Sequence, residues 1–502
     1  MLQRNIIWIG WFAVMALAIW LRVNDLDARP IHFDEATGAL IFSQRFEAEG
    51  YSFDPTHFHG PLLSLSTLPI AKLFGENNWH QLSLPMLRTG PLLAGLIMVL
   101  TPLLWLRTVG PRAALAAGAL LASSPLLVYY NRMYIHESWV ALFGMLTAAA
   151  VFFVIRQPSP KRAILAGIAA GLMFATKGTV AISLLCWTVA GLACWWILRK
   201  DWETKDPGHA LTDYFGPALW FVASLLLTGL IFYGGAIIDA LKSYFVYETT
   251  PGHDKSFGYY LHTMLWPKHA FGTWWSEGGI AILALLACAL TLLKKRSMAV
   301  VAFVTLSVLL HILIYSLLAY KTPWLMSLPW ALACLLGGFV FMKDNSSGSL
   351  GRSAVLVTFF ALCLLYQTHQ SLLANGRLAN HADNPYAYVP TSRNITKMPE
   401  WLKKLESALG KDAVEPIAII GQSFWPLPWY LRDFDQVSYW NQPLDGLNEF
   451  PIVISMPEQT AACNELLSET HTQLPRTLRS NVAISLYLKN DTWEAWTKPS
   501  EE

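Results

Sequence analysis

The chain has 502 residues, of which 54% are hydrophobic and only 14% are charged. Ordinary globular domains carry roughly 25% charged residues, so this composition excludes a small soluble enzyme. Residues 374–502 hold 16 acidic and 11 basic residues, whereas residues 1–373 hold 18 and 25 and contain nearly all the long apolar runs. No basic patch with interleaved aromatic residues occurs, so no nucleic-acid partner is expected. The six cysteines form no CxxC motif or disulfide framework.

Apolar runs predict a membrane domain, because a helix needs about 20 apolar residues to cross a bilayer. Eleven candidate spans lie near residues 6–21, 91–106, 113–129, 139–155, 163–175, 180–198, 219–237, 279–293, 298–319, 325–342 and 353–373. The fifth is short and rich in glycine. We therefore predict a mostly α-helical, polytopic domain at residues 1–373 with about 11 transmembrane helices.

The distribution of Lys and Arg predicts the orientation, since short cytoplasmic loops are enriched in these residues. With a cytoplasmic N-terminus, the inner segments contain Arg107, Arg112, Arg156, Lys161, Arg162, Arg199, Lys200, Lys205, the run 294–296, Lys343 and Arg352. The short outer loops hold one basic residue each. An odd number of spans then places residues 374–502 outside the cytoplasm, in a multi-pass protein of a bacterial or archaeal plasma membrane.

The C-terminal part, residues 374–502, predicts a small α/β domain. Strand-like runs lie at 416–421, 450–456 and 482–488, and helical patterns at 398–409 and 459–467. The Trp-rich stretch 424–440 has two interpretations, which are packing onto the membrane domain and formation of the core of the C-terminal domain itself.

Two long outer loops, 22–90 and 238–278, indicate function, because long connections without one are uncommon. The first contains amphipathic stretches at 36–46 and 61–74 and the densest polar cluster, residues 29–35 (Arg-Pro-Ile-His-Phe-Asp-Glu). In the simplest interpretation this is a solvated loop in which Asp34 caps the following helix. The histidines His32, His57 and His59 and two adjacent acids in one loop favour a functional site instead.

Further polar groups follow other spans on the predicted outer side, around His136 and Glu137, at Lys177 and at Lys321. A carboxylate can deprotonate an acceptor hydroxyl, Arg and Lys can neutralise a phosphate leaving group, and aromatic faces suit sugar rings or a prenyl chain. No cofactor is predicted with certainty. A divalent metal is left open, since His lies near Asp and Glu, but the spacings match no closed zinc pattern.

Four strings carry a family resemblance: residues 32–35 (His-Phe-Asp-Glu), 58–62 (Phe-His-Gly-Pro-Leu), 320–325 (Tyr-Lys-Thr-Pro-Trp-Leu) and 425–432 (Trp-Pro-Leu-Pro-Trp-Tyr-Leu-Arg). The chain resembles the GT-C glycosyltransferases. Its nearest likeness there is to the dolichyl-phosphate-mannose–protein mannosyltransferases and the aminoarabinose transferases of lipid A. The strings are similar in particular to a prokaryotic branch described as flippase-activity-associated membrane proteins.

The resemblance implies an integral-membrane glycosyltransferase that moves a sugar from a polyprenyl-phosphate donor to an extracytoplasmic glycan, lipid or protein, with membrane lipid around it. Asp34 is implied as the base or acceptor-positioning acid, assisted by Glu35. Glu137 falls where the superfamily often has a second acidic motif, although here it reads His-Glu, which puts a metal role in doubt. The implied substrate-binding residues are His32, His59, Arg88, Arg132, His136, Lys177, Lys321, Trp324 and Arg432.

The sequence leaves two other functions open. A transporter or flippase for lipid-linked sugars is the main alternative, but transporters often show internal repeats and polar groups at mid-membrane. This chain shows no repeat, and its polar residues gather at the ends of spans. A non-catalytic scaffold is supported only by the size of the C-terminal domain.

Overall fold

The computed structural model describes residues 2–47, 52–57, 59–199, 209–246, 252–294, 298–342 and 350–498. Phe58 and the basic residues Lys200, Lys205 and Lys343, together with residues 295–296, lie outside these ranges. The chain forms two compact units. The membrane unit comprises Met1–Leu26, Ala48–Phe74 and Pro85–Arg377, and the α/β unit comprises Asp27–Glu47, Gly75–Leu84 and Leu378–Glu502. The predicted division after residue 373 stays a prediction.

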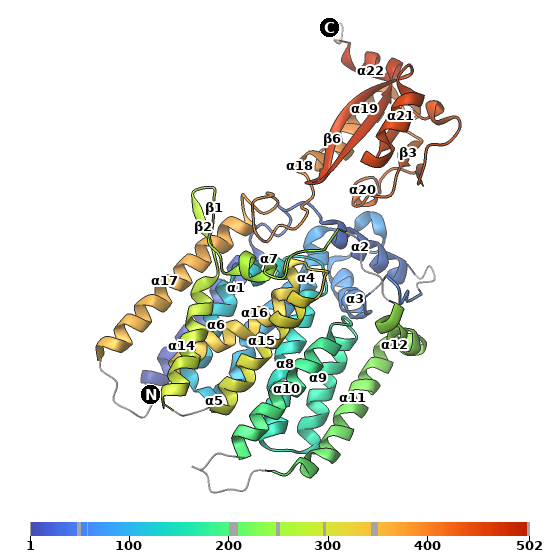
Figure 1. The fold of residues 1–502 in the computed structure, drawn as a ribbon. Helices are drawn as coiled ribbons and strands as arrows, with labels where there is room; N and C mark the ends of the chain where they lie inside the picture. Colours follow the sequence, from blue (N-terminus) through green and yellow to red (C-terminus); the bar gives the residue numbers. More distant parts are fainter. Residues whose placement is uncertain are drawn as a thin grey trace. The chain divides into compact units, whose positions relative to one another are not determined.

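The membrane unit is a bundle of helices with one small β-hairpin (Figure 1). Its longer helices are α1 (Leu2–Val23), α3 (Leu62–Phe74), α4 (Leu84–Leu100), α6 (Pro111–Ser123), α7 (Pro125–Asn131), α8 (Glu137–Arg156), α9 (Pro160–Phe174), α10 (Val180–Arg199), α11 (Phe215–Tyr233), α12 (Ile237–Val246), α13 (Tyr259–Met264), α14 (Gly278–Lys294), α15 (Met298–Leu317), α16 (Ser327–Gly338) and α17 (Leu350–Asn375). Short helices η2 (Thr101–Trp105), α5 (Leu106–Val109), η3 (Leu211–Tyr214), η4 (Gly234–Ala236), η5 (Pro323–Met326) and η6 (Phe339–Phe341) extend or link them. The hairpin pairs β1 (Lys268–Ala270) with β2 (Thr273–Trp275).

All eleven predicted spans are helical. Within the described residues, eight helical segments are long and apolar enough to cross a membrane, or nine if α6 and α7, which meet at a bend of 61°, are counted as one span. The predicted spans 163–175 and 279–293 form α9 and α14, which have 15 and 17 residues and fall below the length of a full span. The prediction of a polytopic helical membrane protein is confirmed.

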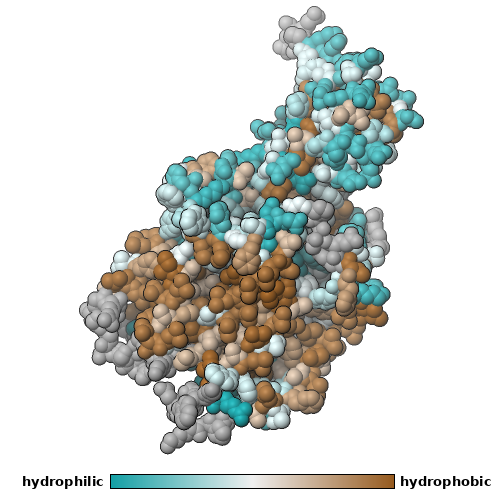
Figure 2. All heavy atoms as spheres, viewed as in Figure 1, coloured by the Kyte–Doolittle hydropathy of each residue, from teal (hydrophilic) through white to brown (hydrophobic). Residues whose placement is uncertain are grey.

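The glycines of the short fifth span have a packing role. A Cβ atom on Gly167 would lie 2.0 Å from Oγ of Ser224, and one on Gly171 would lie 2.5 Å from Cβ of Thr228. Small residues let α9 approach α11 this closely, as is common between membrane helices. The face of the membrane unit seen in Figure 2 is largely hydrophobic, and exposed side chains such as Leu227 and Ile231 contribute to the surface available to lipid.

The α/β unit contains a five-stranded mixed sheet in the order β4-β3-β5-β7-β6. The strands are β3 (Ile417–Ile420), β4 (Val437–Trp440), β5 (Ile452–Ser455), β6 (His471–Arg479) and β7 (Val482–Lys489). Strands β4, β3 and β5 run parallel, and β7 and β6 add an antiparallel pair. The helices are α2 (Phe33–Phe46), η1 (Trp79–Gln81), α18 (Arg393–Thr396), α19 (Met398–Leu409), η7 (Lys411–Ala413), α20 (Leu427–Tyr430), η8 (Leu447–Glu449), η9 (Pro457–Gln459), α21 (Thr460–Leu467) and α22 (Asn490–Thr497).

The sheet has a core on each face, because successive side chains of a strand point to opposite sides. One core gathers Ile417, Ile419, Ile452 and Ile454 with the apolar face of α19 and with residues 427–434 of the Trp-rich stretch. The other gathers alternate residues of the same strands with α21. The predicted strands 416–421, 450–456 and 482–488 and both predicted helices are present. The interpretation of residues 424–440 as part of the domain's own core is confirmed for Leu427, Leu431 and Phe434.

Candidate active site

The acidic pair Asp34-Glu35 lies in the first turn of α2, in the α/β unit. His32 precedes the helix in an extended conformation, and its Nδ1 accepts a hydrogen bond from the backbone N–H of Asp34 at 3.2 Å. In return, Oε2 of Glu35 accepts from the backbone N–H of His32 at 2.9 Å. These two bonds form a capping box, which satisfies backbone donors that a helix start otherwise leaves unpaired. The interpretation of Asp34 as the helix cap is therefore wrong, because His32 takes that place.

The two acids have different surroundings. Glu35 is fully buried and its carboxylate holds the start of the helix. The side chain of Asp34 is 38% exposed, with Oδ2 3.7 Å from Nδ1 of His32. A carboxylate that meets a substrate must be reachable, so the geometry favours Asp34 as the reacting acid and Glu35 as the residue that positions it. The catalytic assignments of both stay predictions.

His32 is held by a residue far along the chain. Its Nε2 lies 3.0 Å from the carbonyl oxygen of Tyr388, and Oγ1 of Thr391 donates to the carbonyl oxygen of the neighbouring Ile31 at 2.6 Å. Because Nδ1 accepts the capping bond, Nε2 must carry the proton, so the ring is neutral. Burial lowers the pKa of His32 from its ordinary value of 6.5 to about 3, opposed mainly by the Glu35 carboxylate. The segment carrying the acids is thus fixed by the C-terminal residues of its own unit.

Arg479, at the end of β6, is a site residue that sequence reasoning missed. Its guanidinium lies over the ring of Phe33 at 4.9 Å, and its NH2 donates to the carbonyl oxygen of Ser423 at 3.0 Å. Burial lowers the pKa of Arg479, whereas the charge of Asp34 raises it, so the two charges act on each other. Arg479 thus places a positive charge against Phe33, the residue that precedes Asp34. No local motif surrounds Arg479 that would have predicted this.

Arg432, a predicted substrate-binding residue, has backbone partners in the α/β unit. Its guanidinium stacks on Trp429 at 3.8 Å and donates to the carbonyl oxygens of Trp429 and Leu82, at 3.1 and 3.2 Å. The Trp429 ring in turn meets Trp79 edge-on, with centroids 5.7 Å apart. Burial lowers the pKa of Arg432. Residues 425–432 therefore pack against and hydrogen-bond to residues 79–82 of the first long loop, which belong to the same unit.

A second polar cluster, made of four predicted site residues, lies in the membrane unit. Nζ of Lys177 lies 2.5 Å from Oε1 of Glu137, and both side chains are more than 90% buried. The rings of His59 and His136 meet edge-on with centroids 5.0 Å apart. Burial lowers the pKa of both histidines, to about 3 for His136, and the nearby Lys177 adds to each shift. The cluster thus combines one buried ion pair with two neutral imidazoles.

Gly60 explains part of the string 58–62. Its backbone N–H donates to the carbonyl oxygen of Thr176 at 3.1 Å, and His136 is hydrogen-bonded to its backbone. A Cβ atom at Gly60 would lie only 2.1 Å from the carbonyl oxygen of Ala175. Glycine is required where two backbone segments approach this closely. This contact brings His59 to the C-terminal end of α9, beside Lys177.

The other predicted binding residues are buried among backbone carbonyls of the membrane unit. Arg88 donates to the carbonyl oxygen of Leu26 at 2.7 Å, Arg132 donates to those of Leu21 and Asp25 at 2.9 and 2.7 Å, and Lys321 donates to those of Lys255 and Leu318. Trp324 is 4% exposed and packs edge-on against Tyr130. Cations at the C-terminal ends of helices stabilise the carbonyls there. Their predicted substrate contacts stay predictions.

Sequence reasoning also missed two buried charged residues. Glu277 accepts hydrogen bonds from Oγ of Ser124, the N–H of Leu126 and Nε1 of Trp330, at 2.6, 3.0 and 2.6 Å, and so fixes the bend between α6 and α7. Arg22 bonds Oδ1 of Asn131 and carbonyl oxygens at the end of α6. Among the residues that the structure describes, no three His, Cys, Asp or Glu side chains are grouped to share a metal ion.

Comparison with known proteins agrees with this architecture. Residues 59–205 match the family of dolichyl-phosphate-mannose-protein mannosyltransferases. The structure is similar to the crystal structure of ArnT from Cupriavidus metallidurans in the apo state, at 16% identity and a TM-score of 0.61, over 95% of this chain and 98% of that one. The same protein bound to undecaprenyl phosphate matches at 15% identity and a TM-score of 0.57, with the same coverage.

A third similar structure is the archaeal oligosaccharyltransferase AglB from Archaeoglobus fulgidus, in complex with an inhibitory peptide and a dolichol-phosphate. It matches at 12% identity and a TM-score of 0.53, over 99% of this chain and 75% of that one. A comparison with curated protein sequences finds no significant match. The protein therefore has the GT-C-like fold that these solved structures share, which confirms the resemblance at the level of the fold alone. The finer likeness to the flippase-activity-associated branch stays a prediction.

Proposed function

We propose that the protein is an integral-membrane glycosyltransferase that transfers a sugar from a polyprenyl-phosphate donor to an extracytoplasmic acceptor. The observation that carries the proposal is the GT-C fold over nearly the whole chain, shared with a solved structure that holds undecaprenyl phosphate. The exposed Asp34, held in place by a capping box, supports it. The N-terminus is proposed to be cytoplasmic and the C-terminal domain extracytoplasmic, in a bacterial or archaeal plasma membrane.

The proposed reaction forms one glycosidic bond and breaks one sugar–phosphate bond. Asp34 accepts the proton of the acceptor hydroxyl as its oxygen attacks the anomeric carbon, and polyprenyl phosphate leaves with the bonding electrons. Glu35 and His32 hold the backbone that presents Asp34. Arg479 supplies a positive charge beside the acid. Lys177, His59 and His136, which cluster within the membrane unit, are proposed substrate-binding residues of that unit.

The test measures polyprenyl phosphate released by the purified protein in liposomes, from undecaprenyl- and dolichyl-phosphate linked to mannose or glucose. Asp34→Asn keeps the size of the side chain and removes the base, so transfer should fall by about 10²–10⁴-fold. Asp435→Asn is the matched control, because Asp435 is an exposed acid of the same unit that pairs with Lys411. It should leave transfer unchanged.

Two outcomes would contradict the proposal. Full transfer by the Asp34→Asn protein would remove the catalytic assignment. Absence of transfer from every donor by the wild-type protein, with labelled lipid crossing the bilayer instead, would favour a flippase of lipid-linked sugars. Arg479→Gln separates a charge effect from a structural one, because its loss of transfer should appear while the thermal unfolding midpoint stays within a few degrees of the wild type.

A further inference from the structure

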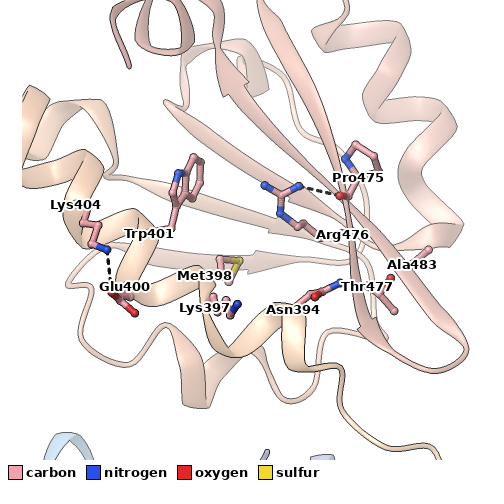
Figure 3. A pocket seen from close by; sticks show the side chains of 10 residues that line it. All are labelled: Asn394, Lys397, Met398, Glu400, Trp401, Lys404, Pro475, Arg476, Thr477 and Ala483. Atoms are coloured by element: carbon pink, nitrogen blue, oxygen red, sulfur yellow. Dashed lines mark hydrogen bonds and ion pairs between the residues drawn. The ribbon is translucent and has the colours of Figure 1, made fainter. Parts of the chain in front are cut away.

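The α/β unit has a groove between helix α19 and the edge strand β6 (Figure 3). Its volume is about 820 Å³, which lies in the range of small-molecule sites. Its lining comes from the helical segment α18–α19 and from the hairpin of β6 and β7, and consists of Asn394, Lys397, Met398, Glu400, Trp401, Lys404, Pro475, Arg476, Thr477 and Ala483. None of these residues belongs to the site around Asp34 or to the four sequence strings that carry the family resemblance.

The charge of the groove differs from that of its surroundings. Lys397, Lys404 and Arg476 face one carboxylate, Glu400, so the lining carries a net charge of +2. Residues 374–502 as a whole hold 16 acidic and 11 basic residues. Glu400 is paired with Lys404 at 2.9 Å, and within the described part of the unit Lys397 and Arg476 have no carboxylate at ion-pair distance. A groove lined with net positive charge attracts anions.

The remaining lining suits a sugar. Trp401 is half-buried and packs its ring partly on the core, which leaves the rest of the ring at the groove. Figure 3 shows Arg476 reaching from β6 toward the helix that carries Trp401. An aromatic face supports the apolar face of a sugar ring, a guanidinium binds a carboxylate or phosphate, and Asn394 and Thr477 offer hydrogen bonds to hydroxyl groups.

A peptide strand and a lipid surface fit the groove less well. β6 is an edge strand, but Pro475 lacks an N–H group and its carbonyl oxygen accepts a hydrogen bond from Arg476 at 3.0 Å, so backbone pairing is blocked there. No large, exposed aliphatic side chain lines the groove among the described residues, whereas membrane docking requires apolar contact in addition to charge.

We infer that this groove binds an acidic glycan, through stacking on Trp401 and ionic hydrogen bonds from Lys397, Lys404 and Arg476. The groove then serves as a docking site for the acceptor, which it would hold by sugars that carry carboxylate or phosphate groups. The identification of this glycan as the acceptor of the transfer reaction rests on the proposed function. Binding itself requires neither donor nor transfer.

The test titrates the full-length protein, in nanodiscs of phosphatidylcholine, with a galacturonate hexasaccharide and with the neutral maltohexaose, by calorimetry and without donor. The acidic sugar should bind at least about tenfold more tightly, and its Kd should rise with ionic strength. Arg476→Gln and Lys404→Gln should each weaken it by about tenfold or more, since each removes a charge-assisted hydrogen bond.

Lys403→Gln is the matched control, because Lys403 precedes Lys404 on α19 but pairs with Asp433 and does not line the groove. It should bind as the wild type does. Equal affinity for the two sugars, or equal affinity of the wild-type and Arg476→Gln proteins, would overturn the inference. So would competition by phosphatidylglycerol nanodiscs alone, which would assign the groove to lipid. Because donor turnover is measured separately through Asp34, failure of either proposal is recognisable on its own.

Discussion

Stability of the segment that carries Asp34 should depend on pH through His32. In the folded unit the ring is neutral, since Nδ1 accepts the N–H of Asp34 and Nε2 faces the carbonyl oxygen of Tyr388. Burial lowers its pKa from 6.5 to about 3; the Glu35 carboxylate and the hydrogen bond to Tyr388 oppose this shift, and the charges of Arg29 and Arg479 add to it. The unfolded segment therefore binds a proton first as the pH falls. The contribution of His32 to the stability of the segment is fully present above pH 6.5 and is lost progressively as the pH falls from 6.5 toward 3.

The size of the effect follows from the two pKa values. Each pH unit between them costs about 1.4 kcal/mol, because one proton binds the unfolded segment and not the folded one. At pH 5 the loss relative to pH 7.5 is about 2 kcal/mol by the same relation. Most carboxylates titrate below this window, so the window from pH 7.5 to 5 reports mainly on histidine.

His32→Asn isolates this contribution. Asparagine is a favoured helix cap and does not titrate, so the helix start is retained while the pH dependence is lost. Hydrogen exchange of amides in α2, corrected for the intrinsic rate at each pH, gives the free energy of local opening. The wild type should lose about 2 kcal/mol between pH 7.5 and 5, and His32→Asn much less. His80→Asn, which changes an exposed histidine of the same unit, should resemble the wild type. Equal slopes for the wild-type and His32→Asn proteins would refute the reasoning.

Two further predictions concern the polar cluster of the membrane unit. Gly60→Ala should destabilise the protein by about 1–3 kcal/mol, because the added Cβ meets a backbone oxygen at 2.1 Å. Gly216→Ala is the control, because Gly216 has open space around it, and it should leave stability unchanged. Equal unfolding midpoints of the Gly60→Ala and wild-type proteins in detergent would count against the close approach. Glu137→Gln should cost about 3–5 kcal/mol, since it leaves a buried ammonium group without its carboxylate. Adding Lys177→Met to that variant should restore part of the loss, and strictly additive effects on the unfolding midpoint would show that the pair is not coupled.

The sequence was sufficient for the apolar spans, for α19 and α21 and for the central strands, because their signal is local. Each predicted span is a long apolar run, and β3 and β5 are continuous apolar runs buried on both faces. Strand β6 was missed, since it is an edge strand that contains Pro475 and two arginines and shows only weak alternation of burial. Strand β4, which lies within the Trp-rich stretch, was also missed, because it is the strand at the opposite edge of the sheet.

The site was less predictable because its geometry depends on distant contacts. Local preference favours Asp over His as a helix cap, yet His32 caps α2, and its ring is oriented by a carbonyl 356 residues away. A basic residue at the end of a span has the same appearance in sequence whether it binds phosphate or helix carbonyls. Arg132 and Lys321 bind carbonyls in the structure, whereas Lys177 pairs with a buried acid.

The grouping of the first long loop with the C-terminal residues changes how the acidic pair should be understood. Residues 27–47 and 75–84 belong to the same compact unit as the five-stranded sheet, and they are held there by Tyr388, Thr391 and Arg432. Asp34 is therefore positioned by contacts within the α/β unit, which come from β6 and from the segment before α18. It follows that the C-terminal domain is part of the catalytic apparatus in the proposed function, because removing it would take away the partners of His32 and the cation beside Asp34.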